Sequence, residues 1–119
     1  ALLNKGYNFA YIHVEAPDEM GHQGLVAEKI EAIEYLDKRV VKILVDELNK
    51  AGEDYRILVL PDHPTPICIR THSRGAVPYM LYDNTQLQYN TWNYNEHEAK
   101  DSNNYVAEGH KIIEKLFEV

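Results

Sequence analysis

Two contrasting halves make up the stretch Tyr55-Arg56-Ile57-Leu58-Val59-Leu60-Pro61-Asp62-His63-Pro64-Thr65-Pro66. Its first half, residues 55–60, is an apolar run of strand length bounded by turn residues, which predicts a β-strand. Its second half holds three prolines, which exclude a regular strand or helix, so we expect a stiff loop. Asp62 and His63 stand side by side on this loop, and His72 lies beyond it. A plain exposed turn would explain these residues as well as a functional site does.

A strand and a long helix are predicted ahead of this stretch. Residues 7–14 are apolar and aromatic with little alternation, which is typical of a strand covered on both faces. Residues 24–51 carry apolar side chains at helical spacing, and Gly52 supplies the stop. Between them, residues 15–22 are expected to form a loop that holds Asp18 and His22. With residues 55–60, the strand and the helix predict a right-handed parallel crossover in an α/β fold. In such folds, sites lie at the carboxyl ends of the strands.

The two ends of the chain are less regular. Residues 1–6 look like the last turn of a helix without its beginning, so we expect the chain to be a piece of something longer. Residues 77–82 predict another short strand. Residues 83–104 are polar and predict a surface excursion, with one helical turn at 96–100 behind Asn95 as cap. From residue 104 the pattern is helical again, although Gly109 weakens it.

Composition excludes several classes of function. A length of 119 residues fits one domain, and a formal net charge of −7 argues against a nucleic-acid or anionic-membrane partner. The single cysteine, Cys68, excludes an internal disulfide and fits a reducing compartment. No apolar run is long enough to span a membrane. We therefore expect a cytoplasmic protein.

Three single residues carry expectations of their own. Asp37 falls in the middle of the apolar stripe of the long helix, which predicts a buried carboxylate with a bonding partner. His13 lies inside the apolar run at 7–14, which favours a core histidine over a ligand. Cys68 has apolar neighbours, which favours a packing role.

Five residues could hold metal ions. Asp18 and His22 are four apart, so one turn of tight loop or helix aims both at one point, and His72 could complete three ligands. Asp62 and His63 would serve a second ion, although neighbouring side chains on an extended loop are expected to point in different directions. Aspartate and histidine without cysteine is the ligand set of Mn²⁺, Zn²⁺ or a similar ion. Two such ions can stabilise the attacking and leaving oxygens of a phosphoryl transfer.

Two segments resemble one known family. His13-Val14-Glu15-Ala16-Pro17-Asp18-Glu19-Met20-Gly21-His22 and Leu58-Val59-Leu60-Pro61-Asp62-His63-Pro64-Thr65-Pro66 are similar to cofactor-independent phosphoglycerate mutases of the archaeal-type branch, within the alkaline phosphatase superfamily. The resemblance covers nearly the whole chain, including Arg70-Thr71-His72. It implies a three-layer α/β fold with a mostly parallel sheet, of which residues 1–119 would be a C-terminal portion of the metal-binding domain.

The resemblance also implies roles for individual residues. In that family the positions of Asp18, His22 and His72 hold one divalent ion, and those of Asp62 and His63 belong to the other. The ions are usually Mn²⁺, with Zn²⁺ or Mg²⁺ as alternatives. The family interconverts 3-phosphoglycerate and 2-phosphoglycerate through a phosphoserine intermediate. A phosphorylated small molecule is therefore the expected substrate, and Arg70 could meet it.

The chain departs from the family pattern in several parts that it lacks, among them the small substrate-clamping domain with its arginines. The nucleophilic serine and a further aspartate have no counterpart here, since Ser73 and Ser102 lie in the wrong contexts. No catalytic residue is therefore assigned, and we expect the isolated chain to be inactive. The same ligands would also suit a phosphatase, phosphodiesterase or sulfatase-like hydrolase, or a homoserine kinase-like enzyme. A module that binds metal without chemistry is a third interpretation.

Overall fold

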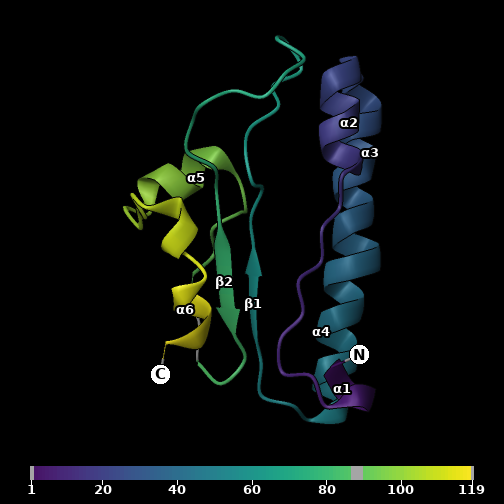
Figure 1. The fold of residues 1–119 in the computed structure, drawn as a ribbon, viewed down its shortest axis with the longest axis vertical. Coiled ribbons are helices and arrows are strands. Elements are labelled where there is room, and N and C mark those ends of the chain that lie inside the picture. The colour runs from purple at the N-terminus through teal and green to yellow at the C-terminus, as the bar shows by residue number, and fades with distance from the viewer. Residues whose placement is uncertain (1, 87–89, 119) are drawn as a thin grey trace. The chain divides into compact units, whose positions relative to one another are not determined.

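The computed structural model of the chain describes residues 2–86 and 90–118. These residues divide into two compact units. The first unit holds residues 2–53 and 65–73, and the second holds residues 54–64 and 74–118 apart from the gap at 87–89. Figure 1 shows the elements in chain order from α1 to α6.

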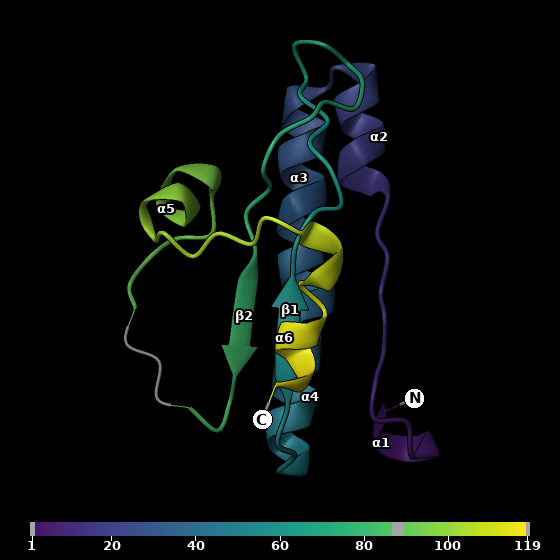
Figure 2. The ribbon, with the colours of Figure 1, turned by 60° about the vertical axis from the view of Figure 1, so that its left-hand side comes forward.

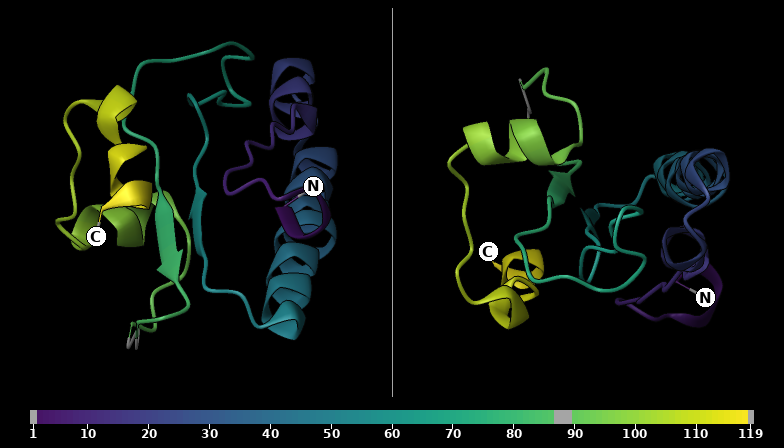
Figure 3. Two further views of the ribbon diagram at one scale, coloured as in Figure 1. Left: turned by 60° about the horizontal axis from the view of Figure 1, so that its bottom comes forward. Right: turned by 90° about the horizontal axis from the view of Figure 1, so that it is seen from above.

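The first unit is helical. Its elements are α1 (Leu2–Lys5), α2 (Ala16–Gln23), α3 (Val26–Leu36), the π-helical turn η1 (Asp37–Val41) and α4 (Lys42–Ala51). The last three follow one another without a break and form one long rod, which Figure 3 shows from a second direction. Helix α2 packs against α3. The predicted helical segment at 24–51 is thus present, and Gly52 ends it with a φ of 70° as expected.

Helix α2 occupies a segment for which the sequence predicted a loop. Pro17 lies in its first turn, where a missing N–H costs nothing, so the proline helps to start the helix. Asp18 and Glu19 in the same turn interact favourably with the positive end of the helix dipole. Gly24 closes the helix at a φ of 73°, and its N–H donates to the carbonyl of Gly21 over 3.1 Å. The prediction of a loop was therefore wrong, since a proline at this position is compatible with the start of a helix.

The apolar stripe of the long helix does not face inward along its whole length. Val26, Ile30 and Ile33 are each more than half exposed, whereas Leu48 near the other end is buried. Asp37, predicted to be buried with a partner, is exposed, so that prediction was wrong. Helical spacing shows that a face is apolar, but it does not show which of two apolar faces packs against a neighbour.

Residues 7–14, predicted as a covered strand, form no strand. Tyr11 is 76% exposed, and His13 is exposed as well, so the expectation of a core histidine was wrong. The His13 ring instead stacks on Tyr11 and lies 3.9 Å from a carboxylate oxygen of Glu15. A strand exists only where its backbone pairs with a neighbour, and an apolar run cannot specify that neighbour. The predicted parallel crossover is therefore not formed in the described residues.

The second unit is built on a two-stranded sheet. Strands β1 (Arg56–Val59) and β2 (Met80–Asp83) pair antiparallel, as Figure 2 shows. In their register Arg56 lies opposite Asp83. Both strands fall within the ranges predicted for them or extend one residue beyond. The mostly parallel sheet of the predicted three-layer fold is not found in the described residues. The connection from β1 to β2 contains no helix, so the chain returns beside β1 in the opposite direction instead of crossing over.

An ion pair joins the facing ends of the two strands. Arg56 donates from Nε to Asp83 Oδ2 over 2.7 Å, and the Thr85 hydroxyl donates to Asp83 Oδ1 over 2.6 Å. The hydrogen bond from the Thr85 side chain and then that from Arg56 lower the pKa of Asp83 to about 2. The pairing register is thus reinforced by a charged hydrogen-bond network.

Short helices complete the second unit. In α5 (Glu96–Asp101) the Asn95 side chain accepts from the N–H of Glu98 over 2.9 Å, so the predicted cap is confirmed. The helix predicted beyond residue 104 is reduced to a 3₁₀ turn, η2 (Gly109–Lys111), and one turn of α6 (Glu114–Phe117). Helix α6 lies against β1, and Ile112 just before it is buried. None of the described helices combines the length and the apolarity needed to cross a membrane.

Candidate metal centre

Asp18, His22 and His72 come together within the first unit. His22 Nε2 lies 3.3 Å from Asp18 Oδ2, and His72 Nε2 lies 3.3 Å from Asp18 Oδ1. The two Nε2 atoms are 3.1 Å apart. One ligand atom from each residue lies within 4.8 Å of the others, which is close enough for all three to contact one ion. Asp18 is partly buried, whereas both histidines are exposed.

Helix α2 and the segment at 65–72 each contribute to this cluster. On α2, Asp18 and His22 are one turn apart and therefore share a face. In the second segment the N–H of Arg70 donates to the Pro66 carbonyl over 2.9 Å, which closes a turn before His72. Arg70 itself has a φ of 53°, a left-handed conformation that is uncommon without glycine.

The tautomer of His22 follows from its neighbours. Its Nδ1 lies 3.0 Å from the Arg70 carbonyl oxygen, which can only accept a hydrogen bond. Nδ1 must therefore carry the proton, and the lone pair of neutral His22 is on Nε2. That nitrogen is the one that points toward His72 and Asp18. A hydrogen bond from the other ring nitrogen to a carbonyl is the usual way in which a histidine ligand is oriented.

Two further residues, not singled out from the sequence, surround the Asp18 carboxylate. The Thr65 hydroxyl donates to Asp18 Oδ1 over 2.5 Å, and Lys29 Nζ donates to the Thr65 carbonyl oxygen over 2.7 Å. Thr65 is only 6% exposed. In the sequence Thr65 is one residue in a proline-rich loop and Lys29 one lysine on an amphipathic helix. No pattern distinguished them.

Gly21 permits this close packing. A β-carbon added to it would lie 2.7 Å from the Thr65 carbonyl oxygen and 2.9 Å from Lys29 Nζ. The flexible Lys29 side chain can move aside, but the backbone oxygen of Thr65 cannot easily do so, and this contact opposes a side chain at the position. At Gly24 the atoms close to an added β-carbon belong to the flexible Arg70 side chain, and the φ of 73° is the feature that favours glycine. The sequence explained neither glycine by its contacts.

The donor set fits a divalent cation. One carboxylate and two imidazoles suit Mn²⁺, Zn²⁺ or a related ion, and no thiolate is near to favour a softer metal. Cys68, for which the sequence suggested a packing role, is instead exposed.

Comparison with known proteins assigns the family. Residues 1–110 of the chain match the family model described as the metalloenzyme superfamily. The chain belongs to the metalloenzyme superfamily. A 2,3-bisphosphoglycerate-independent phosphoglycerate mutase of Methanothrix thermoacetophila is 41% identical over 92% of the chain. One of Methanothermobacter thermautotrophicus is 42% identical over 94% of it. A probable mutase of Geobacter sulfurreducens is 37% identical over 96% of it. These similarities confirm the resemblance that the two sequence segments indicated.

The match covers only part of each relative. The chain spans 28% of the Methanothrix protein, 27% of the Methanothermobacter protein and 29% of the Geobacter protein. No solved structure matches the chain.

The second predicted ligand pair of this metalloenzyme chain lies in the second unit. His63 Nε2 is 3.4 Å from Asp62 Oδ2, and the backbone N–H of His63 donates to Asp62 Oδ1 over 3.0 Å. The two side chains therefore meet, and the expectation that they point in different directions was wrong. The hydrogen bond from the His63 backbone N–H turns the Asp62 carboxylate toward His63. One ion could contact both residues.

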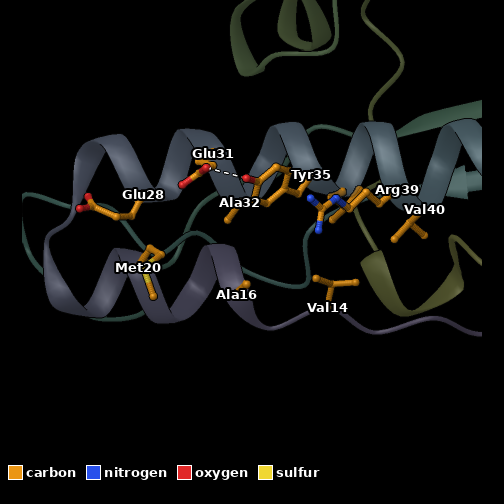
Figure 4. A pocket seen from close by; sticks show the side chains of 10 residues that line it. Val14, Ala16, Met20, Glu28, Glu31, Ala32, Tyr35, Arg39 and Val40 are labelled. Atoms are coloured by element: carbon orange, nitrogen blue, oxygen red, sulfur yellow. Dashed lines mark hydrogen bonds between the residues drawn. The ribbon is translucent and has the colours of Figure 1, made fainter.

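A separate groove runs along the first unit beside α2 and α3 (Figure 4). It has a volume of about 440 Å³, and its lining residues include Val14, Met20 and Leu36. On its wall the Tyr35 hydroxyl donates to Glu31 Oε1 over 2.7 Å, which raises the pKa of Tyr35. None of the three clustered ligands lines this groove.

Proposed function

We propose that the chain supplies metal-binding residues to a phosphoglycerate mutase that needs no bisphosphoglycerate cofactor. The enzyme interconverts 3-phosphoglycerate and 2-phosphoglycerate through a phosphoserine intermediate, as a cytoplasmic step of glycolysis and gluconeogenesis. The observation that carries the proposal is the convergence of Asp18, His22 and His72 within 4.8 Å. The names of the similar proteins support the choice of reaction.

The residues of the chain divide between two ions in this proposal. Asp18, His22 and His72 hold one divalent ion, with Mn²⁺ as the first choice, and Asp62 and His63 contribute to a second. Such ions, when bound, neutralise phosphoryl oxygens and align the attacking and leaving groups. His22 is oriented by the Arg70 carbonyl, and the exposed guanidinium of Arg70 offers a cation to a phosphorylated substrate.

The reaction is tested in the polypeptide that carries these residues, expressed as its gene encodes it. We expect it to convert 3-phosphoglycerate to 2-phosphoglycerate with Mn²⁺ in an enolase-coupled assay, and His22→Ala to abolish the conversion. Hydrolysis of p-nitrophenyl phosphate without mutase activity would instead identify a phosphatase. Phosphorylation of homoserine would identify a kinase, and either result would overturn the proposal.

A further inference from the structure

We propose that Thr65 is a positioning residue for the Asp18 carboxylate, and that its hydroxyl prepares this carboxylate to bind a metal ion. The inference rests on the metal centre of the proposed function, and it assigns a role to a residue outside the ligand set. Thr65 Oγ1 lies 2.5 Å from Asp18 Oδ1. An ionised carboxylate can only accept, so the hydroxyl is the donor.

The hydrogen bond distinguishes the two oxygens of Asp18. Each oxygen lies 3.3 Å from Nε2 of one histidine, Oδ1 from that of His72 and Oδ2 from that of His22, but only Oδ1 accepts the proton of the Thr65 hydroxyl. A short hydrogen bond from a hydroxyl to a carboxylate is charge-assisted and directional. It fixes the rotation of the carboxylate group, so that Oδ2 stays beside Nε2 of His22, the nitrogen whose lone pair can bind a metal ion. Without the hydroxyl, the carboxylate would have to lose this rotational freedom when the ion binds.

Thr65 is itself held in place. Lys29 Nζ donates to its carbonyl oxygen over 2.7 Å, and the closely approaching Gly21 packs against its backbone and its methyl group. The residue is 6% exposed, so water has little access to the hydrogen bond. A β-branched side chain has few χ1 rotamers, which further limits where the hydroxyl can point. Helices α2 and α3 thus both contribute to the position of one hydroxyl group.

The experiment compares Thr65→Val, which keeps the shape, with Thr65→Ser, which keeps the hydroxyl. Mn²⁺ binding is measured by isothermal titration calorimetry, and the environment of the bound ion by electron paramagnetic resonance. Loss of an outer partner of a metal ligand typically weakens metal affinity roughly 10–100-fold. We expect such a loss in Thr65→Val and recovery to within about threefold of the wild type in Thr65→Ser.

A control separates positioning from structural damage. Thr91→Val removes a hydroxyl from an exposed position in the second unit and should leave Mn²⁺ affinity unchanged. Urea unfolding without metal reports the stability of each variant, and Thr65→Ser should have a midpoint close to that of the wild type, because it keeps the hydrogen bond to Asp18. A changed resonance spectrum of residual bound Mn²⁺ in Thr65→Val would show an altered carboxylate geometry, which a purely structural role would not produce.

The outcomes distinguish this inference from the proposed function. Equal Mn²⁺ affinity in the wild type and Thr65→Val overturns the role of Thr65 and leaves the metal centre intact. Weak binding in both Thr65→Val and Thr65→Ser, with lowered metal-free midpoints in both, also overturns it in favour of packing. A wild-type chain that binds no Mn²⁺ overturns the metal centre and, with it, the inference.

Discussion

Nδ1 of His22 lies 3.0 Å from the carbonyl oxygen of Arg70, a residue whose φ of 53° places it in the left-handed region. The carbonyl orients the histidine because Arg70 adopts this conformation. The contribution of Arg70 to the cluster is therefore made by its backbone, whatever its guanidinium does. Main-chain conformation and side-chain charge at this position can be tested independently.

Arg70→Gly and Arg70→Val both remove the guanidinium, but only glycine accepts a positive φ without cost. We expect Arg70→Gly to keep wild-type Mn²⁺ affinity. A β-branched residue held at this φ should lose about 1–3 kcal/mol of stability and weaken Mn²⁺ binding, since the carbonyl would move. Calorimetric titration and urea unfolding measure the two effects. Equal Mn²⁺ affinities in the two variants would contradict the role of the Arg70 backbone in orienting His22.

Removal of a ligand should have a larger effect. We expect His22→Ala and His72→Ala each to reduce Mn²⁺ affinity by more than the roughly 10–100-fold typical of an outer partner. His97→Ala is the matched control, because His97 is 87% exposed on α5 in the other unit. Metal analysis after dialysis gives the stoichiometry. As many tightly held ions in a ligand variant as in the wild type would refute the site, and so would two tightly held ions in the wild-type chain.

Gly21→Ala should disturb the cluster through crowding. Its β-carbon would collide with the Thr65 carbonyl oxygen, which sits 2.7 Å from the ideal position. Overpacking of this kind typically costs about 1–3 kcal/mol, and displacement of Thr65 should also lower Mn²⁺ affinity. Gly109→Ala, where nothing lies within 4 Å of the added carbon, should leave both unchanged. If Gly21→Ala kept the stability and the Mn²⁺ affinity of the wild type, the segment around Thr65 would be able to move away without cost, contrary to this prediction.

Asp83 should make the stability of the second unit depend on pH. Its pKa falls from 3.8 to about 2, chiefly through hydrogen bonds from Thr85 and Arg56. A depressed carboxylate pKa stabilises the folded state above the unfolded pKa, and that stabilisation disappears as the pH falls through about 2. We therefore expect Asp83→Asn to unfold at lower urea than the wild type at pH 7, with the gap closing toward low pH.

The single tryptophan, Trp92, reports on this unit by fluorescence. Asp54→Asn, which changes an exposed carboxylate of the second unit, is the control and should unfold like the wild type at every pH. A gap between Asp83→Asn and the wild type that does not change with pH would mean that the Asp83 charge plays no part.

What the sequence predicted correctly was determined by local chemistry. Asn95 caps α5 and Gly52 ends α4, because each interaction involves residues within one turn. The four-residue spacing of Asp18 and His22 also needs only a local turn, so their approach was predictable. The arrival of His72 beside them was anticipated from family resemblance as well as from ligand chemistry.

What the sequence did not predict depends on distant neighbours. The apolar run at 7–14 has the composition of a covered strand, but pairing partners decide whether a strand forms. Asp37 was predicted to be buried because it shares a helix face with apolar residues such as Ile30 and Ile33. That face is exposed in the structure, and Asp37 is exposed with it. Thr65 and Lys29 were missed because their role arises from a contact between residues 36 apart.

His22 and His72 are 50 residues apart in the chain. An ion held by both would close a ring of that length, as a disulfide does. Closing a ring of such size with a covalent bond removes about 4 kcal/mol of unfolded-state entropy, in the chain-entropy treatment. A metal ion dissociates when its ligands separate, so unlike a disulfide it would bind the folded chain, in which this ring is already closed, far better than the unfolded chain. It would hold α2 to the segment that follows β1, and a chelator would remove it without breaking any covalent bond.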